Sequence, residues 1–287
     1  MPLVQVNGTE LYCESSGSGE PVLLIPGLGL DHTYYAQALP SFAPHMRTFA
    51  VDPRGVGRSR KDRCDYSVEL WADDFAALVD SLGLKDVHVL GTSLGGAIAL
   101  SMAARHPAKV KSVMAIGAFS ELNESVHLNY SLRKRLIAKI GLCEELADFI
   151  SLWIMSPQFI ETEQGARIAI NLRQSIQKND PELYVSFLDA ILKLGKRTPG
   201  VEPPLTRQLS EIRVPTLVAC SDNDHFIPAA LSKVIASRIP HAQYAEIPRG
   251  GHIPFIEQPD AAARVVIEFL NSLASKGQVA SMPSQTN

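Results

Sequence analysis

The sequence has little excess charge of either sign. Its 287 residues carry 27 Lys and Arg against 30 Asp and Glu, which gives a net charge of −3. A balance this close to neutral gives no reason to expect nucleic acid or an anionic membrane surface as a partner. We therefore expect neither of them.

Long apolar segments are also missing. No run approaches the roughly 20 apolar residues that are needed to cross a bilayer. The chain does not open with a basic segment followed by an apolar run, which is the pattern of a signal peptide. These observations predict a cytoplasmic protein that has no membrane partner.

Cysteine is scarce and scattered. The sequence has four cysteines and no C-x-x-C pair, so it predicts neither a zinc site nor a disulfide framework. Scattered cysteines in a chain of this length fit a reducing compartment. No other cluster of metal ligands stands out, and we expect no metal and no organic cofactor. The cysteines are Cys13, Cys64, Cys143 and Cys220.

Hydrophobic residues are plentiful, at 46% of the chain, and they fall into short runs. The run PVLLI at 21–25 is nearly all apolar, which is typical of a strand that is buried on both faces of a parallel sheet. Helical patterns lie between the runs, and this alternation predicts an α/β protein with a mostly parallel central sheet and flanking helices. The expected strands are 21–25, 47–52, 86–90, 110–116, 216–220 and 242–247, and the expected helices are 67–82, 94–106, 229–238 and 260–273.

The alternation stops between residues 119 and 209. This stretch shows helical periodicity with several breaks and no convincing buried strand, which indicates a helical cap inserted over the carboxyl edge of the sheet. We expect a core of residues 1–118 and 210–274, and a polar, disordered tail over 275–287. Within the cap, the run Arg133, Lys134 and Arg135 could meet an acidic substrate, although such a run is usually a solvated helix face.

The strongest chemical signal is GTSLG at 91–95, which follows a predicted strand and precedes a predicted helix. G-x-S-x-G in this setting is a nucleophile elbow, in which the serine occupies a strained, sharp turn at the top of the sheet. The two glycines leave room for strand and helix to approach closely, and the helix dipole favours developing negative charge. We predict that Ser93 is the nucleophile.

A serine hydroxyl needs a base, and the base needs a group that orients it. His252 lies in RGGHIPFIEQP directly after the last predicted strand, where two glycines allow the loop to bring the imidazole over the sheet edge. The orienting acid should follow the preceding strand, and CSDNDHFIP offers both Asp222 and Asp224. The chain order serine, acid, histidine matches the order expected with a nucleophile elbow.

The segment PGLGLDH at 26–32 follows the first buried strand. A loop at this place donates one N–H group of the oxyanion hole, and the residue after the nucleophile donates the other. This nominates the backbone N–H groups of Leu28 and Leu94. Leu28, Leu94 and Ile253 should lie on the pocket floor. The candidate pocket walls, each of a type that is more often plain core packing, are Tyr34, Tyr35, Phe119, Trp153 and Phe226.

Five blocks in this order resemble the α/β-hydrolase superfamily along nearly the whole chain. They are LLIPGLG, VDPRGVGRS, GTSLGG, IRVPTLVACSDNDHFIP and GGHIPFIEQP. The resemblance implies a catalytic triad of Ser93, Asp224 and His252, because the family's acid stands four residues before a proline, as Asp224 does before Pro228. Many members have His-Gly where this chain has Pro26-Gly27.

Size, cap and closing block resemble the 3-oxoadipate enol-lactonase and related esterase group. The resemblance implies a carboxylic ester or lactone hydrolase that acts on a small molecule. A serine nucleophile argues against haloalkane dehalogenases and epoxide hydrolases, which need a carboxylate. Two alternatives stay open: a carbon–carbon bond hydrolase of the meta-cleavage type, and a ligand receptor with little turnover. The sequence gives no signal for the oligomeric state.

Overall fold

A seven-stranded sheet forms the centre of the molecule. The structure is a computed structural model, and it describes residues 3–280. The strand order is β3-β5-β4-β6-β7-β8-β9, and a separate hairpin joins β1 to β2. The strands are β1 Val4–Val6, β2 Thr9–Leu11, β3 Cys13–Gly17, β4 Glu20–Ile25, β5 Met46–Val51, β6 Val87–Thr92, β7 Val110–Ile116, β8 Thr216–Ser221 and β9 Gln243–Ile247.

The sheet is parallel from β5 to β9, and only β3 pairs antiparallel, with β5. Every residue of β6 and β8 is buried, as expected for strands covered on both faces. The predicted α/β class with a mostly parallel sheet is therefore confirmed. All six predicted strands are present to within one or two residues.

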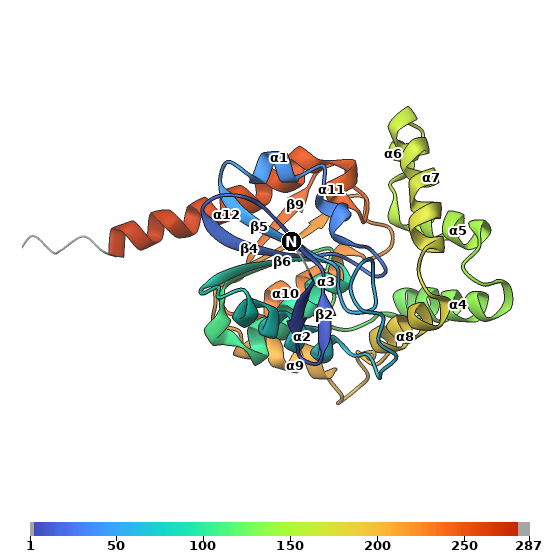
Figure 1. The fold of residues 1–287 in the computed structure, drawn as a ribbon, viewed down its shortest axis with the longest axis horizontal. Helices are drawn as coiled ribbons and strands as arrows, with labels where there is room; N and C mark the ends of the chain where they lie inside the picture. Colours follow the sequence, from blue (N-terminus) through green and yellow to red (C-terminus); the bar gives the residue numbers. More distant parts are fainter. Residues whose placement is uncertain (1–2, 281–287) are drawn as a thin grey trace, which may run out of the picture.

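Helices cover both faces of the sheet (Figure 1). Helices α1, α11 and α12 lie on one face, and α2, α3 and α10 lie on the other. The helices are α1 Leu39–Phe42, α2 Val68–Ser81, α3 Leu94–Arg105, α4 Glu124–Ile140, α5 Glu144–Ile154, α6 Pro157–Ile160, α7 Glu163–Gln177, α8 Pro181–Leu192, α9 Pro204–Gln208, α10 Ala229–Arg238, α11 Pro254–Glu257 and α12 Pro259–Ala280. Among the described residues, no helix combines the length and apolarity that crossing a membrane requires.

One strand of the central sheet, β3, escapes sequence analysis. The segment of β3, CESSG, is short and polar, and serine and glycine are poor strand formers. It becomes a strand because it pairs along its whole length with β5, from Cys13 opposite Val51 to Gly17 opposite Arg47. Pairing with a neighbour overrides local propensity here.

The helices α4 to α8 form a group at one side of the sheet, between β7 and β8 in the chain (Figure 1). Both ends of this insertion meet at a neck, where Leu122 bridges to Lys196 and buried Glu121 accepts from the Thr206 hydroxyl. Helix α9 contacts α3 of the core. It follows the group α4 to α8 in the chain and precedes β8, so it lies within the stretch 119–209 that is expected to form the cap.

The sequence predicts the start of the disordered tail too early, at residue 275. Helix α12 continues to Ala280, so residues 275–280 are helical and not disordered, while the rest of the expected tail, 281–287, lies outside the described residues. Extending an existing helix costs far less than starting one, because the nucleating turn is already formed. No proline interrupts α12 after its first residue, so the polar composition alone does not end it.

Candidate active site

Ser93 lies in the sharp turn between β6 and α3. Its backbone has φ 56° and ψ −121°, a conformation that L-residues rarely adopt. The flanking glycines are required sterically. A Cβ atom on Gly91 would lie 2.0 Å from the Gly95 carbonyl oxygen, and one on Gly95 would lie 2.2 Å from the Ile25 carbonyl oxygen. The turn therefore has the geometry of a nucleophile elbow.

Three residues from three separate loops are linked by hydrogen bonds. The His252 Nε2 atom lies 2.8 Å from Ser93 Oγ, and His252 Nδ1 lies 2.7 Å from Asp224 Oδ2. All three are buried, with 5% exposure for Ser93 and His252 and 9% for Asp224. These are the contacts that a serine nucleophile, its base and an orienting acid require.

The two candidate acids have different environments. Asp222 is exposed, and its backbone N–H donates to the Ile247 carbonyl. The Asp224 carboxylate points inward, where Oδ1 accepts from the N–H groups of Phe226 and Ile227 and Oδ2 faces the imidazole. Only Asp224 contacts His252, in the position implied by the family resemblance.

The loop that carries His252 is attached to the helical insertion α4 to α8. The His252 N–H donates to the Ile154 carbonyl at the end of α5, over 2.8 Å. The buried Glu257 carboxylate accepts from the Ser156 hydroxyl at 2.6 Å and from the Gly251 N–H at 3.0 Å. Burial raises the pKa of Glu257, and these hydrogen bonds offset part of the shift. Sequence analysis misses Glu257, and a lone glutamate in a loop gives no signal for such a role.

The loop after β4 lies beside the nucleophile. A Cβ atom on Gly27 would lie 3.3 Å from Ser93 Cβ. The next residue is Leu28, and Leu94 opens α3 directly after Ser93. Neither backbone N–H has an acceptor among the residues that the structure describes. Both groups are therefore available to a ligand at Ser93 Oγ, as an oxyanion hole requires.

A cavity that we call the inner pocket lies over Ser93 and His252. Of the expected wall and floor residues, Leu28, Tyr34, Phe226 and Ile253 line it. Residues of α5, α7 and α8 complete its apolar walls. Sequence analysis does not single them out, because which face of such a helix points inward depends on how the helices of the insertion pack. These residues are Ile150, Ile154, Leu172, Ile176 and Tyr184.

Three expected wall residues lie elsewhere. The hydroxyl of Tyr35 donates to the Ile25 carbonyl in the core, and Phe119 is fully buried. Trp153 is half-buried and packs on Phe149. Each of these side chains packs against its neighbours and does not line the inner pocket. Large aromatic side chains are more often part of the packed core.

The charge run in α4 is only partly solvated. Arg135 is exposed, but Arg133 is 2% exposed and lines the inner pocket. Consecutive helical residues point about 100° apart, because an α-helix has 3.6 residues per turn. One residue of a run of three can therefore face inward, so the solvated-face interpretation is wrong for Arg133.

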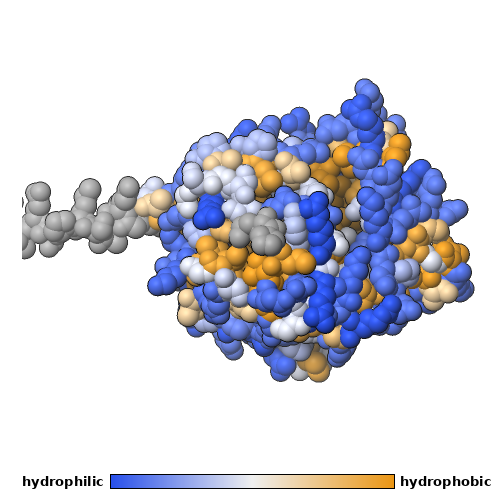
Figure 2. All heavy atoms as spheres, viewed as in Figure 1, coloured by the Kyte–Doolittle hydropathy of each residue, from blue (hydrophilic) through white to orange (hydrophobic). Residues whose placement is uncertain are grey.

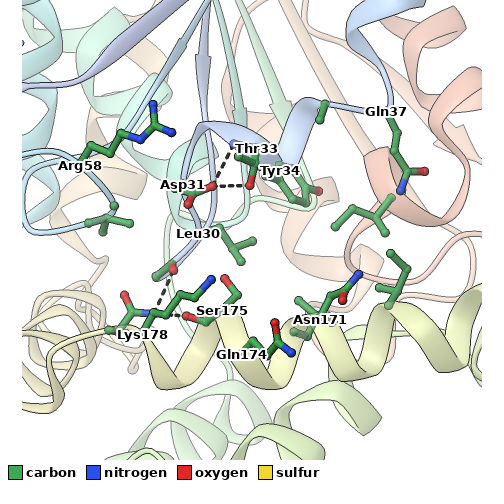
Figure 3. A pocket seen from close by; sticks show the side chains of 18 of the residues that line it. Leu30, Asp31, Thr33, Tyr34, Gln37, Arg58, Asn171, Gln174, Ser175 and Lys178 are labelled. Atoms are coloured by element: carbon green, nitrogen blue, oxygen red, sulfur yellow. Dashed lines mark hydrogen bonds between the residues drawn. The ribbon is translucent and has the colours of Figure 1, made fainter. Parts of the chain in front are cut away.

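A second, open cavity, the outer groove, lies between the loop after β4 and helix α7 (Figure 3). It shares Leu30, Tyr34 and Leu172 with the inner pocket, so the two cavities adjoin. Figure 2 shows a largely hydrophilic surface on the cap side, with apolar residues recessed between cap and core. The outer groove therefore adjoins the pocket that contains Ser93.

Asp31, His32 and Asp52 bring three possible metal ligands together. The Asp52 carboxylate already accepts from the N–H groups of His32 and Arg58, and its Oδ1 lies 2.6 Å from His32 Nδ1. We assign this cluster a structural role. The contacts of the Asp52 carboxylate hold the loop after β4 against the loop after β5.

Comparison with known proteins agrees with this geometry. A family model described as the alpha/beta hydrolase fold matches residues 20–138 and 158–259. The chain belongs to the α/β-hydrolase superfamily. It is a hydrolase of this superfamily, and its substrate is therefore a small molecule.

The superfamily members most similar to the chain include a putative carbamate hydrolase, RutD, from Azorhizobium caulinodans. It is 26% identical, and the match covers 95% of this chain and 99% of the relative. The enol-lactonase from Burkholderia xenovorans LB400 has a TM-score of 0.83 and 26% identity over 94% of this chain and all of that one. A meta-cleavage product hydrolase has a TM-score of 0.74 at 22% identity, covering 94% and 98%, which is a likeness of fold alone.

Proposed function

We propose that this hydrolase cleaves a carboxylic ester or a lactone through an acyl-enzyme on Ser93. The observation that carries the proposal is the hydrogen-bonded series Ser93–His252–Asp224. A buried carboxylate on one imidazole nitrogen fixes the tautomer that leaves the other nitrogen free to accept a proton. The enol-lactonase that this chain resembles supports an ester or lactone as substrate.

In the proposed cycle, His252 Nε2 takes the Ser93 proton while Oγ attacks the carbonyl carbon. The N–H groups of Leu28 and Leu94 donate to the oxyanion, whose charge develops only in the transition state. The leaving alkoxide takes the proton from His252, and an acyl-enzyme remains. Water then repeats both steps, with His252 again as the base, and releases the acid.

We also propose that α4 to α8 act as a cap that selects the substrate. Ile150, Ile154, Leu172 and Ile176 of these helices supply apolar walls to the inner pocket. The hydrogen-bonded series lies at the carboxyl edge of the sheet, because Ser93, Asp224 and His252 follow β6, β8 and β9. The chemistry and the selectivity thus come from different parts of the chain.

A cytoplasmic location is part of the proposal. All four cysteines are free thiols, and Cys64 is exposed. An exposed thiol is best preserved where glutathione and thioredoxin keep cysteines reduced.

The test is a substrate screen on purified wild-type protein and Ser93→Ala. We expect turnover of 4-nitrophenyl esters or small lactones, unaffected by EDTA, and labelling of wild type but not Ser93→Ala by a fluorophosphonate probe. Turnover restricted to dienone acids would favour the carbon–carbon bond hydrolase, and turnover restricted to carbamates would favour the activity named for the RutD relative. Equal labelling of both proteins would refute Ser93 as nucleophile, and binding without any turnover would favour the receptor.

A further inference from the structure

Arg133 is a buried cation in the inner pocket without a partner. Its side chain takes part in no ion pair among the described residues, and its Nε and Nη2 atoms are buried and have no hydrogen-bond partner there. Burial lowers the pKa of this guanidinium, and the neighbouring Tyr184 and Tyr130 offset only part of the shift. Arginine nevertheless stays protonated in proteins. An uncompensated buried charge is costly, so its presence at this place needs an explanation.

Two aromatic rings hold the guanidinium in place. Arg133 Cζ lies 4.4 Å from the centroid of the Phe226 ring and 5.6 Å from that of Tyr130. Phe226 in turn packs edge-on against the His252 imidazole, with ring centroids 5.0 Å apart. Stacking on aromatic faces binds a guanidinium cation but uses none of its N–H groups. The cation is therefore fixed one ring away from the proposed base, and its Nε and Nη2 donors have no hydrogen-bond partner among the described residues.

The two unpartnered nitrogens form one edge of the guanidinium. Nε–H and Nη2–H point in the same direction and match the two oxygens of a carboxylate. This chain uses that edge elsewhere. Arg54 donates from Nε and Nη2 to Asp74 over 2.7 and 2.6 Å, and Arg197 donates from the same atoms to Glu121 over 3.0 and 2.8 Å.

We propose that the substrate carries a carboxylate group, which Arg133 binds through its Nε and Nη2 edge while the reacting carbonyl lies at Ser93. This inference deepens the proposed function and rests on it for the identity of the reaction. One guanidinium matches the single charge of a carboxylate and would leave a dianionic phosphate half neutralised. Among the described residues, the buried hydroxyls of Tyr34 and Tyr130 also have no hydrogen-bond partner and can bind further polar atoms of the same molecule.

The outer groove has a charge that suits an anion. It is lined by Arg58, Lys61 and Lys178 and by one acid, Asp31. Figure 3 shows Lys178, which directly follows α7, opposite the loop that carries Asp31. A net positive approach raises the local concentration of anionic ligands and their association rate. The groove and Arg133 therefore favour the same class of ligand.

The test measures binding, so it does not depend on turnover. The probes are 4-oxopentanoate, 5-oxohexanoate and 6-oxoheptanoate, which have a ketone in place of the ester, and their neutral primary amides. We expect wild type and Ser93→Ala to bind at least one keto acid more tightly than its amide. The preference should be about 10- to 100-fold, the usual value of hydrogen bonds to a charged group. Arg133→Met should abolish it, and Arg133→Lys should retain part of it, because lysine keeps the charge but lacks the fork.

The matched control is Arg135→Met, which removes the same charge from an exposed position on the same helix. It should keep the preference. Arg133→Met should also unfold at the same temperature as wild type or higher, because it removes an unpaired buried charge. Arg133→Gln serves the same purpose if Arg133→Met does not fold. The proposal is overturned if no keto acid binds better than its amide, or if the preference survives in the folded Met or Gln variant. Failure of the ester screen alone would overturn only the proposed function.

Discussion

The Nε2 atom of His252 lies 2.8 Å from the Oγ atom of Ser93, although the two residues are 159 positions apart in the chain. The elbow after β6 and the loop after β9 bring them together at the same edge of the sheet. The contact depends on an unfavourable backbone conformation at Ser93, which leads to the first prediction.

Ser93→Gly should stabilise the protein while it abolishes hydrolysis. A non-glycine residue in a sparsely populated backbone region costs about 1–3 kcal/mol, whereas glycine costs about 0.5–1 kcal/mol in conformational entropy. The free energy of unfolding should therefore rise by roughly 1 kcal/mol, and kcat should fall by about 10⁶. Urea unfolding and an ester assay test both. A Ser93→Gly variant that is less stable than Ser93→Ala would show that the turn is not strained.

The acid position is tested by a pair of variants. Asp224→Asn should leave the fold intact and lower kcat by about 10⁴, because an amide holds the imidazole in the wrong tautomer. Asp222→Asn changes an exposed side chain that has no contact with His252, so its kcat should be close to wild type. Measuring kcat and melting temperature side by side separates the two. A crippled Asp222→Asn beside a near-normal Asp224→Asn would reverse the assignment.

Close packing at the elbow predicts a severe effect of one methyl group. Gly95→Ala would place Cβ 2.2 Å from the Ile25 carbonyl oxygen, so strand and helix must separate. We expect a loss of about 1–3 kcal/mol in stability together with lost activity, because Ser93 moves with the turn.

Gly83→Ala is the matched control. Gly83 follows the end of helix α2 at φ 64°, and a Cβ atom there meets nothing within 4 Å. This variant should lose about 1–2 kcal/mol from backbone strain alone and keep its kcat. Comparable kcat values in Gly83→Ala and Gly95→Ala would count against a sterically required elbow.

Glu257 predicts a pH dependence of stability. Its pKa is raised in the folded protein above the ordinary 4.5, chiefly by burial. The folded state then holds this proton more tightly than the unfolded state, so its contribution to stability falls as pH rises from about 4.5 through the folded pKa. Glu257→Gln removes this contribution. The stability of wild type relative to Glu257→Gln should therefore decline over that window in thermal unfolding at stepped pH. A difference that grows with pH would contradict the assignment.

Sequence analysis predicts the strands well because buried parallel strands are short and largely apolar, as 110–116 and 216–220 are. It identifies the Ser93, Asp224 and His252 candidates because each follows a strand and thus reaches the same edge. It fails for β3, whose residues become a strand only when they pair with β5. The contacts among Ser93, Asp224 and His252 at the carboxyl edge of the sheet depend on the strand topology. The order of strands and helices along the chain indicates that topology, so the contacts can be predicted.

The walls of the inner pocket are harder to predict. Whether Arg133 or Arg135 faces inward depends on how α4 is rotated against its neighbours, and both stand in the same charged run. Trp153 and Phe119 are large and near the expected cap, yet packing uses them elsewhere. Helix existence follows from local periodicity, but helix orientation follows from long-range contacts that a single sequence does not show.

The attachment of the cap to the histidine loop limits how freely this region can be exchanged between relatives. Ile154 and Ser156 belong to the insertion, while their partners His252 and Glu257 are about a hundred residues further along the chain. A graft that replaces the insertion alone would leave the Glu257 carboxylate buried without its hydroxyl donor. A working chimera needs Ser156 and Glu257 to be transplanted as one unit, so the smallest portable piece of this enzyme is discontinuous in sequence.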